Sequence, residues 1–249
     1  MKIEAILTPA ELPALKQCDL HDAACVVFDV LRATSTIVTA LHHGAKIVIP
    51  VSEISEALVR RQKQPGVLLG GERDGVRIRA AQAGGVDFDL GNSPREYTPE
   101  KVRDKTIVST TTNGTRALRA GARAKTVVAA SFLNLSATAK FLRQLSPAHV
   151  LLVCAGTREN TAFEDVLAAG ALCGMLLADA RPHEISDSAE IARRTWMQAK
   201  DNLAAAVATS ENARRLLAIP ELRDDVSFCL QHDLFPLVAR MEADGIIRS

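Results

Sequence analysis

The stretch Val108–Leu118, VSTTTNGTRAL, joins two kinds of pattern at one point of the chain. It begins as the end of an apolar run, typical of a buried strand, and becomes a helix-like pattern from Thr115. Between them stand four hydroxyl residues, Ser109–Thr112, followed by Asn113 and Gly114. A strand, a polar turn and a helix form the repeating unit of an α/β fold. Two roles are open for this turn: an anion cradle at a helix start, or an ordinary turn with a helix cap.

The same alternation of apolar runs and helix-period segments recurs on both sides of this stretch. We expect strands at Lys2–Leu7, Cys25–Val30, Lys46–Val51, Val67–Leu69, Thr106–Ser109, Thr126–Ala130, Val150–Cys154 and, late in the chain, Val226–Leu230. We expect helices over Thr34–His43, Glu53–Gln64, Thr115–Gly121, Ser136–Leu145, Phe163–Ala178 and Ile185–Ser210. This order predicts a three-layer α/β/α sandwich with a largely parallel or mixed sheet, in a single domain spanning residues 1–249.

A similarity between two segments of the sequence leaves open that the fold consists of two related βαβ halves. Ala40–Ser55 and Ala117–Asn134 share Ala-Leu, two further residues, Gly-Ala and then a strand that ends at a serine. The segment Arg73–Pro99 differs from both, because it is rich in Gly, Asp, Asn and Pro and has little periodicity. An irregular segment of that length predicts a functional loop.

Bulk composition excludes several classes of protein. The 30 basic and 29 acidic residues balance, and one Trp and one Tyr give few stacking platforms, so we expect no nucleic-acid partner. The five cysteines form no CxxC pair, which argues against a disulfide framework or a zinc site. The N-terminus does not resemble a signal peptide, and the apolar run Val166–Ala178 is shorter than the roughly 20 residues of a membrane span. We therefore expect a cytoplasmic protein with no membrane partner.

Polar residues gather where the predicted strands end. They are Asp29–Thr36, Gly70–Arg73, Thr110–Thr115, Ser131–Asn134 and Cys154–Thr157. In a parallel sheet these ends share one rim, where ligands bind. Hydroxyls, helix starts and arginines favour an anion, and carboxylates suit Mg²⁺. The pattern indicates phosphoryl transfer, although capping by Thr34–Thr36 and dipole pairing by Glu164 and Asp165 explain parts of it equally well.

Read in order, the motifs resemble the 2-phosphosulfolactate phosphatase family, the ComB-like proteins. They are DVLRATST (Asp29–Thr36), LLGGER (Leu68–Arg73), FDLGNSP (Phe88–Pro94), TTTNGT (Thr110–Thr115), SFLN (Ser131–Asn134), CAG and FEDVLAAG (Cys154–Gly170), and DDVSFCLQHD (Asp224–Asp233). The resemblance covers nearly the whole chain. The sequence departs from the family at Asp87, where glycine is usual before Phe88, in a lengthened segment after the GGER motif.

The resemblance implies an α/β/α fold of its own type and a Mg²⁺-dependent phosphatase acting on 2-phospho-3-sulfolactate, a step of coenzyme M biosynthesis. Carried onto this chain, it implies catalytic roles for Asp29, Arg32 and Glu72, and metal ligands drawn from Asp29, Glu72, Glu164 and Asp165. The substrate-binding residues would be Arg73, Asn92, Ser93, Thr111, Thr112, Asn113, Gly114, Thr115, Ser131 and Asn134. Because the sequence shows no Ser/His or Cys/His pair, we expect a metal-oriented water as the nucleophile, with a covalent aspartyl route through Asp29 as the alternative.

Two alternatives to this activity stay open. One is a phosphatase for a different small phospho-acid, and the other is a non-catalytic anion-binding protein on the same fold. The partner in each case is a small anionic molecule, and a homodimer is left open.

Overall fold

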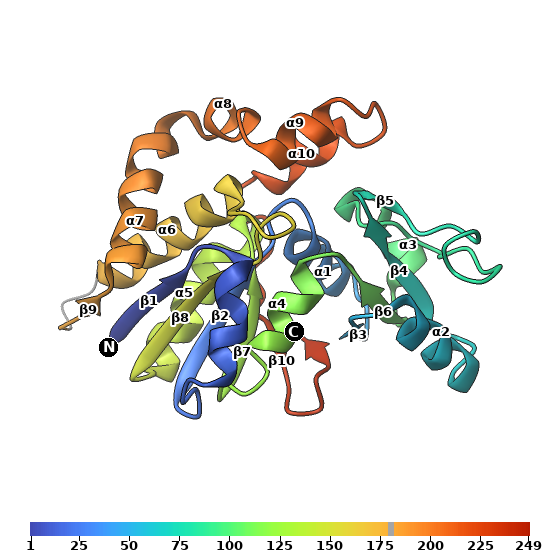
Figure 1. Cartoon of the computed structure of the whole chain (residues 1–249), viewed down its shortest axis with the longest axis horizontal. Helices are drawn as coiled ribbons and strands as arrows, with labels where there is room; N and C mark the ends of the chain where they lie inside the picture. The colour runs from blue at the N-terminus through green and yellow to red at the C-terminus, as the bar shows by residue number, and fades with distance from the viewer. Residues whose placement is uncertain (179–181) are drawn as a thin grey trace.

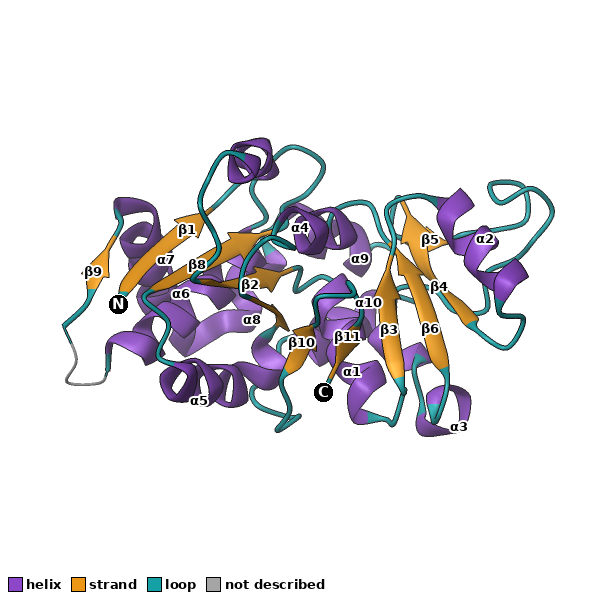
Figure 2. Ribbon diagram, turned by 90° about the horizontal axis from the view of Figure 1, so that it is seen from below, coloured by secondary structure: helices purple, strands orange, loops and turns teal. Residues whose placement is uncertain are grey.

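The computed structural model describes residues 1–178 and 182–249, and its strands form one eleven-stranded mixed sheet (Figures 1 and 2). The strand order across the sheet is β5-β4-β6-β3-β11-β10-β7-β2-β8-β1-β9. The strands are β1 (Lys2–Ile6), β2 (Ala23–Phe28), β3 (Ile47–Pro50), β4 (Leu68–Arg73), β5 (Val76–Arg77), β6 (Thr106–Thr110), β7 (Thr126–Ala130), β8 (His149–Cys154), β9 (Glu184–Ile185), β10 (Ala239–Met241) and β11 (Ile247–Arg248).

The helices divide between the two faces of this sheet. They are α1 (Ala33–His42), α2 (Ile54–Lys63), α3 (Pro99–Val102), α4 (Gly114–Ala120), α5 (Leu135–Leu145), α6 (Phe163–Leu177), α7 (Asp187–Ala199), α8 (Leu203–Ala208), α9 (Glu211–Leu217) and α10 (Arg223–Cys229), with 3-10 turns η1 (Pro9–Lys16), η2 (Pro94–Glu96), η3 (Phe132–Asn134) and η4 (Lys200–Asn202). Val26 of β2 faces a core shared with α5 and α6, whereas Val27 faces a second core shared with α1 and α4. Adjacent strand residues point to opposite faces, so burial on both sides requires the continuous apolar runs seen in the sequence.

Two units of three neighbouring parallel strands lie on either side of the β10–β11 hairpin, and β1 and β9 extend one of them in parallel at its outer edge. In one unit β2 lies between β7 and β8, and in the other β6 lies between β3 and β4. The chain runs β2-α1-β3-α2-β4 and later β6-α4-β7-α5-β8, so each path starts in the centre of one unit and crosses to the other. The two echoing sequence segments therefore occupy equivalent places in the fold, at the α1–β3 and α4–β7 connections.

The two parallel units run in opposite directions. Three successive antiparallel pairings, β3 with β11, β11 with β10 and β10 with β7, separate them. Strand twist raises diagonally opposite corners of a sheet toward the same face. The carboxyl ends of both units consequently approach each other, and the first residues of α1 and α4 meet, because a β-carbon on Gly114 would lie 2.5 Å from Cβ of Ala33.

The predicted α/β class and its seven principal strands are confirmed, and three predictions are corrected. Val226–Leu230 is not a strand, because it lies in α10 with Asp224 and Asp225 in the first turn and Val226 and Cys229 buried. Ile185–Ser210 is not one helix, because the side chain of Asn202 accepts a hydrogen bond from Ala205 N and starts a new one at α8. The segment 73–99 is not wholly irregular, since it holds β5 and η2.

None of the helices in the described part of the chain is long and apolar enough to cross a membrane.

Candidate active site

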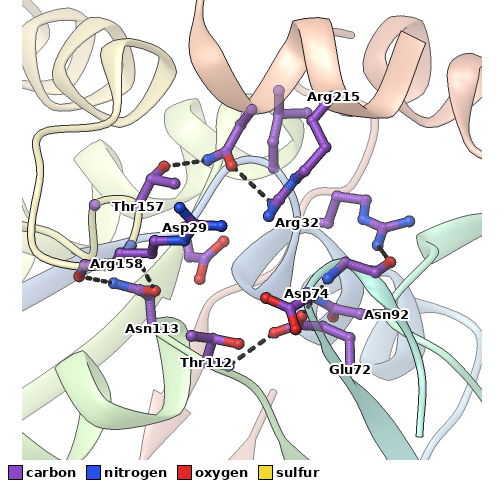
Figure 3. Close-up of a pocket in the computed structure, with 14 residues that line it drawn as sticks. Asp29, Arg32, Glu72, Asp74, Asn92, Thr112, Asn113, Thr157, Arg158 and Arg215 are labelled. Atoms are coloured by element: carbon purple, nitrogen blue, oxygen red, sulfur yellow. Dashed lines mark hydrogen bonds between the residues drawn. The ribbon is translucent and has the colours of Figure 1, made fainter. Parts of the chain in front are cut away.

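The carboxyl ends of β2, β4, β6 and β8 surround one open cavity (Figure 3). Helix α9 adds residues from above. The cavity is lined by Asp29, Leu31, Arg32, Glu72, Asp74, Gly75, Asn92, Thr112, Asn113, Gly156, Thr157, Arg158, Asn212 and Arg215. Six of the predicted site residues are among them: Asp29, Arg32, Glu72, Asn92, Thr112 and Asn113.

Asp29 is a buried carboxyl group with one oxygen left free for a ligand. Its Oδ1 accepts from Ala33 N at 3.0 Å, and among the described residues no donor binds Oδ2. Burial raises the pKa of Asp29 to about 7, with help from the negative charges of Glu72 and Glu164 and against the Ala33 N–H and Arg32. A carboxyl group that is buried so deeply that its pKa rises this far is typical of a functional site rather than of a helix cap.

Arg32 is held rigidly at the cavity wall. Its Nη1 lies 2.6 Å from Asp225 Oδ2, and the two side chains are 2% and 0% exposed. Its Nη2 donates to Gly75 O at 2.5 Å, and Ser93 Oγ donates to the other carboxylate oxygen of Asp225 at 2.7 Å. Ser93 therefore contacts the ion pair rather than the cavity, and Arg32 already has a carboxylate partner.

Most hydrogen-bond donors of the turn Thr110–Thr115 are bonded to other groups of the protein. Thr112 N donates to Glu72 Oε1 at 2.7 Å, while Thr111 and Thr115 bond to each other through backbone and hydroxyl groups. The Asn113 amide donates to the carbonyls of Ala155 and Arg158 and accepts from Arg158 N, which ties α4 to the loop after β8. The anion that the backbone of this turn holds is thus the Glu72 carboxylate. Only Thr112 and Asn113 of the turn line the cavity.

Two arginines that the sequence analysis missed face the cavity. Arg158 follows β8 and extends toward Asp29, and Arg215 reaches in from α9 (Figure 3). Among the described residues, no carboxylate lies within ion-pair distance of either guanidinium, in contrast to Arg32. Arg158 stands one residue beyond the polar segment Cys154–Thr157, so a wider reading would have included it. No sequence motif marks Arg215, and nothing in the sequence distinguishes it from its neighbour Arg214.

The four predicted metal ligands do not form one cluster. Both oxygens of Asp165 accept backbone N–H groups, from Val30 at 2.8 Å and Gly156 at 3.0 Å, and burial followed by the charges of Asp29 and Glu164 raises its pKa well above the usual range. Glu164 lies behind the cavity wall with Asn212 bonded to Oε1. Within the described part of the chain, no group of three or more His, Cys, Asp or Glu side chains could hold a metal. Asp29 and Glu72 alone of the four line the cavity.

Three other predicted residues lie outside the cavity, with structural bonds of their own. Ser131 and Asn134 form a capping box at η3, where Ser131 N donates to Asn134 Oδ1 at 3.0 Å. Arg73 turns back to the carbonyls of Glu72 and Ser52 and to Thr110 Oγ1. The geometry gives these residues a role in local structure, and their predicted contact with a substrate stays a prediction.

Most of the chain matches proteins of one family. The model of the 2-phosphosulpholactate phosphatase family matches residues 7–244. The chain belongs to the 2-phosphosulfolactate phosphatase family. It is 45% identical over 213 residues to a "Probable 2-phosphosulfolactate phosphatase" of Thermotoga petrophila, covering 86% of each chain. A protein of the same description from Caldanaerobacter subterraneus is 40% identical over 235 residues, covering 93% of this chain and 92% of the relative.

This membership confirms the resemblance drawn from the motifs and makes the chain one of a family of phosphoric monoester hydrolases. The departure from the family at Asp87 does not reach the cavity. The Asp87 carboxylate accepts from Ala80 N at 2.8 Å and closes an exposed loop, and from the segment 73–99 only Asp74, Gly75 and Asn92 line the cavity.

Proposed function

We propose that this protein is a Mg²⁺-dependent phosphatase that hydrolyses the phosphate monoester of a small anionic acid, with 2-phospho-3-sulfolactate as the first candidate. The observation that carries the proposal is the free Oδ2 of buried Asp29, placed in a cavity that also holds Arg158 and Arg215. A carboxylate beside arginines that have no carboxylate partner within the described part of the chain provides for both a cation and a phosphoryl group. The family membership supplies the candidate substrate.

The donor set fits Mg²⁺ of the kind that keeps most of its waters. Such an ion needs only one or two protein carboxylates together with water and substrate phosphate. Asp29 through Oδ2 and Glu72 across the cavity would hold it (Figure 3). When bound, Mg²⁺ would neutralise negative charge that builds up on the phosphoryl oxygens. Glu164 and Asp165 are left out of this set because their surroundings place them behind the wall.

The remaining side chains would bind and orient the phosphoryl group. Hydrolysis forms a bond between a water oxygen and phosphorus and breaks the bond between phosphorus and the ester oxygen, which leaves as an alcohol after taking a proton. Arg158 extends toward Asp29 and would bind equatorial phosphoryl oxygens, where charge is concentrated (Figure 3). Arg32 lines the wall beside Asp29, where its ion pair with Asp225 holds it in place.

The test is phosphate release from 2-phospho-3-sulfolactate and from a panel of small phosphate esters, with Mg²⁺ and with EDTA. We expect turnover of the sulfonated ester that EDTA abolishes and Mg²⁺ restores. Asp29→Asn should lower kcat by orders of magnitude, whereas Asp22→Asn, at the exposed opposite end of β2, should leave it unchanged. Preference for another phospho-acid would support the alternative substrate. Full turnover in EDTA would overturn the metal assignment, and no turnover of any ester would overturn the catalytic one.

A further inference from the structure

Arg215 is held in place by a buried chain of polar groups that the hydrolysis proposed above does not use. Its Nη2 donates to Asn212 Oδ1 at 2.9 Å. The Asn212 amide nitrogen donates to Thr157 Oγ1 at 2.6 Å and to Glu164 Oε1 at 2.8 Å. Asn212 is 6% exposed and Glu164 is 1% exposed, so these bonds are shielded from water.

Glu164 determines the orientation of the Asn212 side-chain amide. A carboxylate accepts hydrogen bonds and donates none, so the Asn212 NH₂ group must face Glu164. The amide oxygen is then left on the side of α9, where it accepts from Arg215. The charge of a residue behind the cavity wall thereby fixes the orientation of a cation inside it.

The Arg215 guanidinium still has capacity for an anion. Its Nε is a buried polar atom that has no hydrogen-bond partner among the residues that the structure describes. The group lies alongside Gly75, where an added β-carbon would stand 3.6 Å from its Cζ, so it cannot swing away through that side. A guanidinium that lines a cavity with N–H groups unbonded to the protein can donate them to a bound anion.

Arg215 enters the cavity from a different element than the groups of the proposed phosphoryl site. Arg158 reaches Asp29 from the loop after β8, whereas Arg215 descends from α9 and its guanidinium ends beside Gly75 (Figure 3). In a small phospho-acid, the phosphate ester and the further acid group are attached to different carbon atoms, so they reach different parts of a binding site. We propose that Arg215, oriented by Glu164 through Asn212, binds the acid group of the substrate that is not the phosphate ester. Arg215 is then a specificity residue and Glu164 a positioning residue, and the assignment rests on the proposed function.

The test compares 2-phospho-3-sulfolactate, 2-phospholactate and isopropyl phosphate, which carry two, one and no acid groups besides the ester. Arg215→Met should lower the ratio of kcat/KM for the sulfonated ester to that for isopropyl phosphate by on the order of 100-fold, mainly through KM. The matched control is Arg214→Met, one residue away on α9, where the side chain is exposed and bonds to Thr209 O. This variant should keep the wild-type ratio.

Glu164→Gln tests the positioning role separately. The glutamine side chain can donate as well as accept, so the Asn212 amide loses its fixed orientation. We expect the same ratio to fall in this variant, with the thermal midpoint as a check on folding. If Arg215→Met lowers kcat/KM equally for all three esters, or for none of them, the ratio is unchanged and the proposal is overturned. An unchanged ratio in Glu164→Gln alone would overturn the positioning role.

A binding measurement separates this proposal from the proposed function. Calorimetric titration with 3-sulfolactate, which has no phosphate, should show binding to the wild-type protein that Arg215→Met removes and Arg214→Met retains. That result would support the role of Arg215 even if none of the three esters were hydrolysed. Absence of 3-sulfolactate binding to the wild-type protein would overturn it.

Discussion

Gly114, the first residue of α4, lies directly against Asp29, because a β-carbon on Gly114 would stand 2.6 Å from Asp29 Oδ2. The glycine thus leaves room for the one carboxylate oxygen that has no donor among the described residues. The contact joins the two crossing connections of the fold, since Asp29 precedes α1 and Gly114 begins α4.

Gly114→Ala should therefore damage the site and not only the turn. The new methyl group would also meet Cβ of Ala33 at 2.5 Å, so the Asp29 carboxylate or the start of α1 must move. We expect a loss in kcat of at least 10-fold and destabilisation of about 1–3 kcal/mol, the range for overpacking. Gly174→Ala is the control, since its β-carbon meets nothing within 4 Å. Phosphatase kinetics and urea unfolding measure both effects, and wild-type kinetics for Gly114→Ala would contradict them.

The Arg32–Asp225 pair should be a major contributor to stability. Asp225→Asn would leave the Arg32 charge buried without its counter-ion, which typically costs about 3–5 kcal/mol. Asp224→Asn is the matched control, because the Asp224 side chain is 66% exposed and pairs only with Arg95 at 3.3 Å. Its loss should stay below about 1 kcal/mol. Similar unfolding free energies for the two variants would show that the buried pair is not the main anchor of α10.

The Asp29 carboxyl should make the stability of the metal-free protein depend on pH. An aspartate in the unfolded chain titrates near 3.9, whereas the pKa of Asp29 is raised to about 7 in the folded protein. The folded state therefore binds this proton more tightly, and its contribution to stability is complete below about pH 4 and is lost as the pH rises through 7. Asp29→Asn should be increasingly more stable than the wild-type protein between pH 4 and 8, by up to about 4 kcal/mol.

Unfolding in EDTA at several pH values measures this difference. Asp22→Asn serves as the control, because Asp22 is exposed at the other end of β2 and should add no pH-dependent term. A gap between Asp29→Asn and wild type that does not change with pH would contradict the raised pKa.

Asn134→Ala should affect stability more than substrate binding. It removes the bond from Ser131 N to Asn134 Oδ1 and the capping box of η3, a loss of about 1 kcal/mol. The Michaelis constant should stay at the wild-type value, because Asn134 does not line the cavity. A large rise in KM with unchanged stability would restore the substrate-binding role expected from the sequence.

Much of the fold could be predicted from local pattern. Continuous apolar runs such as Val150–Cys154 need cover on both faces, and short hydroxyl-rich turns after them mark strand ends. The C-terminal hairpin β10–β11 could not be predicted in this way, because its strands are three and two residues long and their other pairing partners, β7 and β3, lie far away in the chain. The opposite directions of the two parallel units depend on that hairpin.

The candidate site likewise contains residues that the local sequence predicts and residues that it does not. Asp29 and Glu72 could be found because each stands at a strand end in a recognisable motif. Arg215 could not, since its importance comes from the packing of α9 above the cavity and from Asn212 and Glu164, which lie 3 and 51 residues away in the chain. Ser131 and Asn134 stand at a strand end too, yet the Asn134 side chain accepts from the backbone N–H of Ser131 instead of lining the cavity.

By itself, the sequence determined the α/β class, the family and the rim of polar strand ends, because these depend on local periodicity and on motifs read in order. The tertiary structure decided what the stretch VSTTTNGTRAL does with its donors. Its backbone N–H at Thr112 holds Glu72, its Gly114 makes room for Asp29, and arginines from elsewhere supply the positive charge. Hydrogen bonds and free charges are properties of neighbours in space, which only the packing of distant segments brings together.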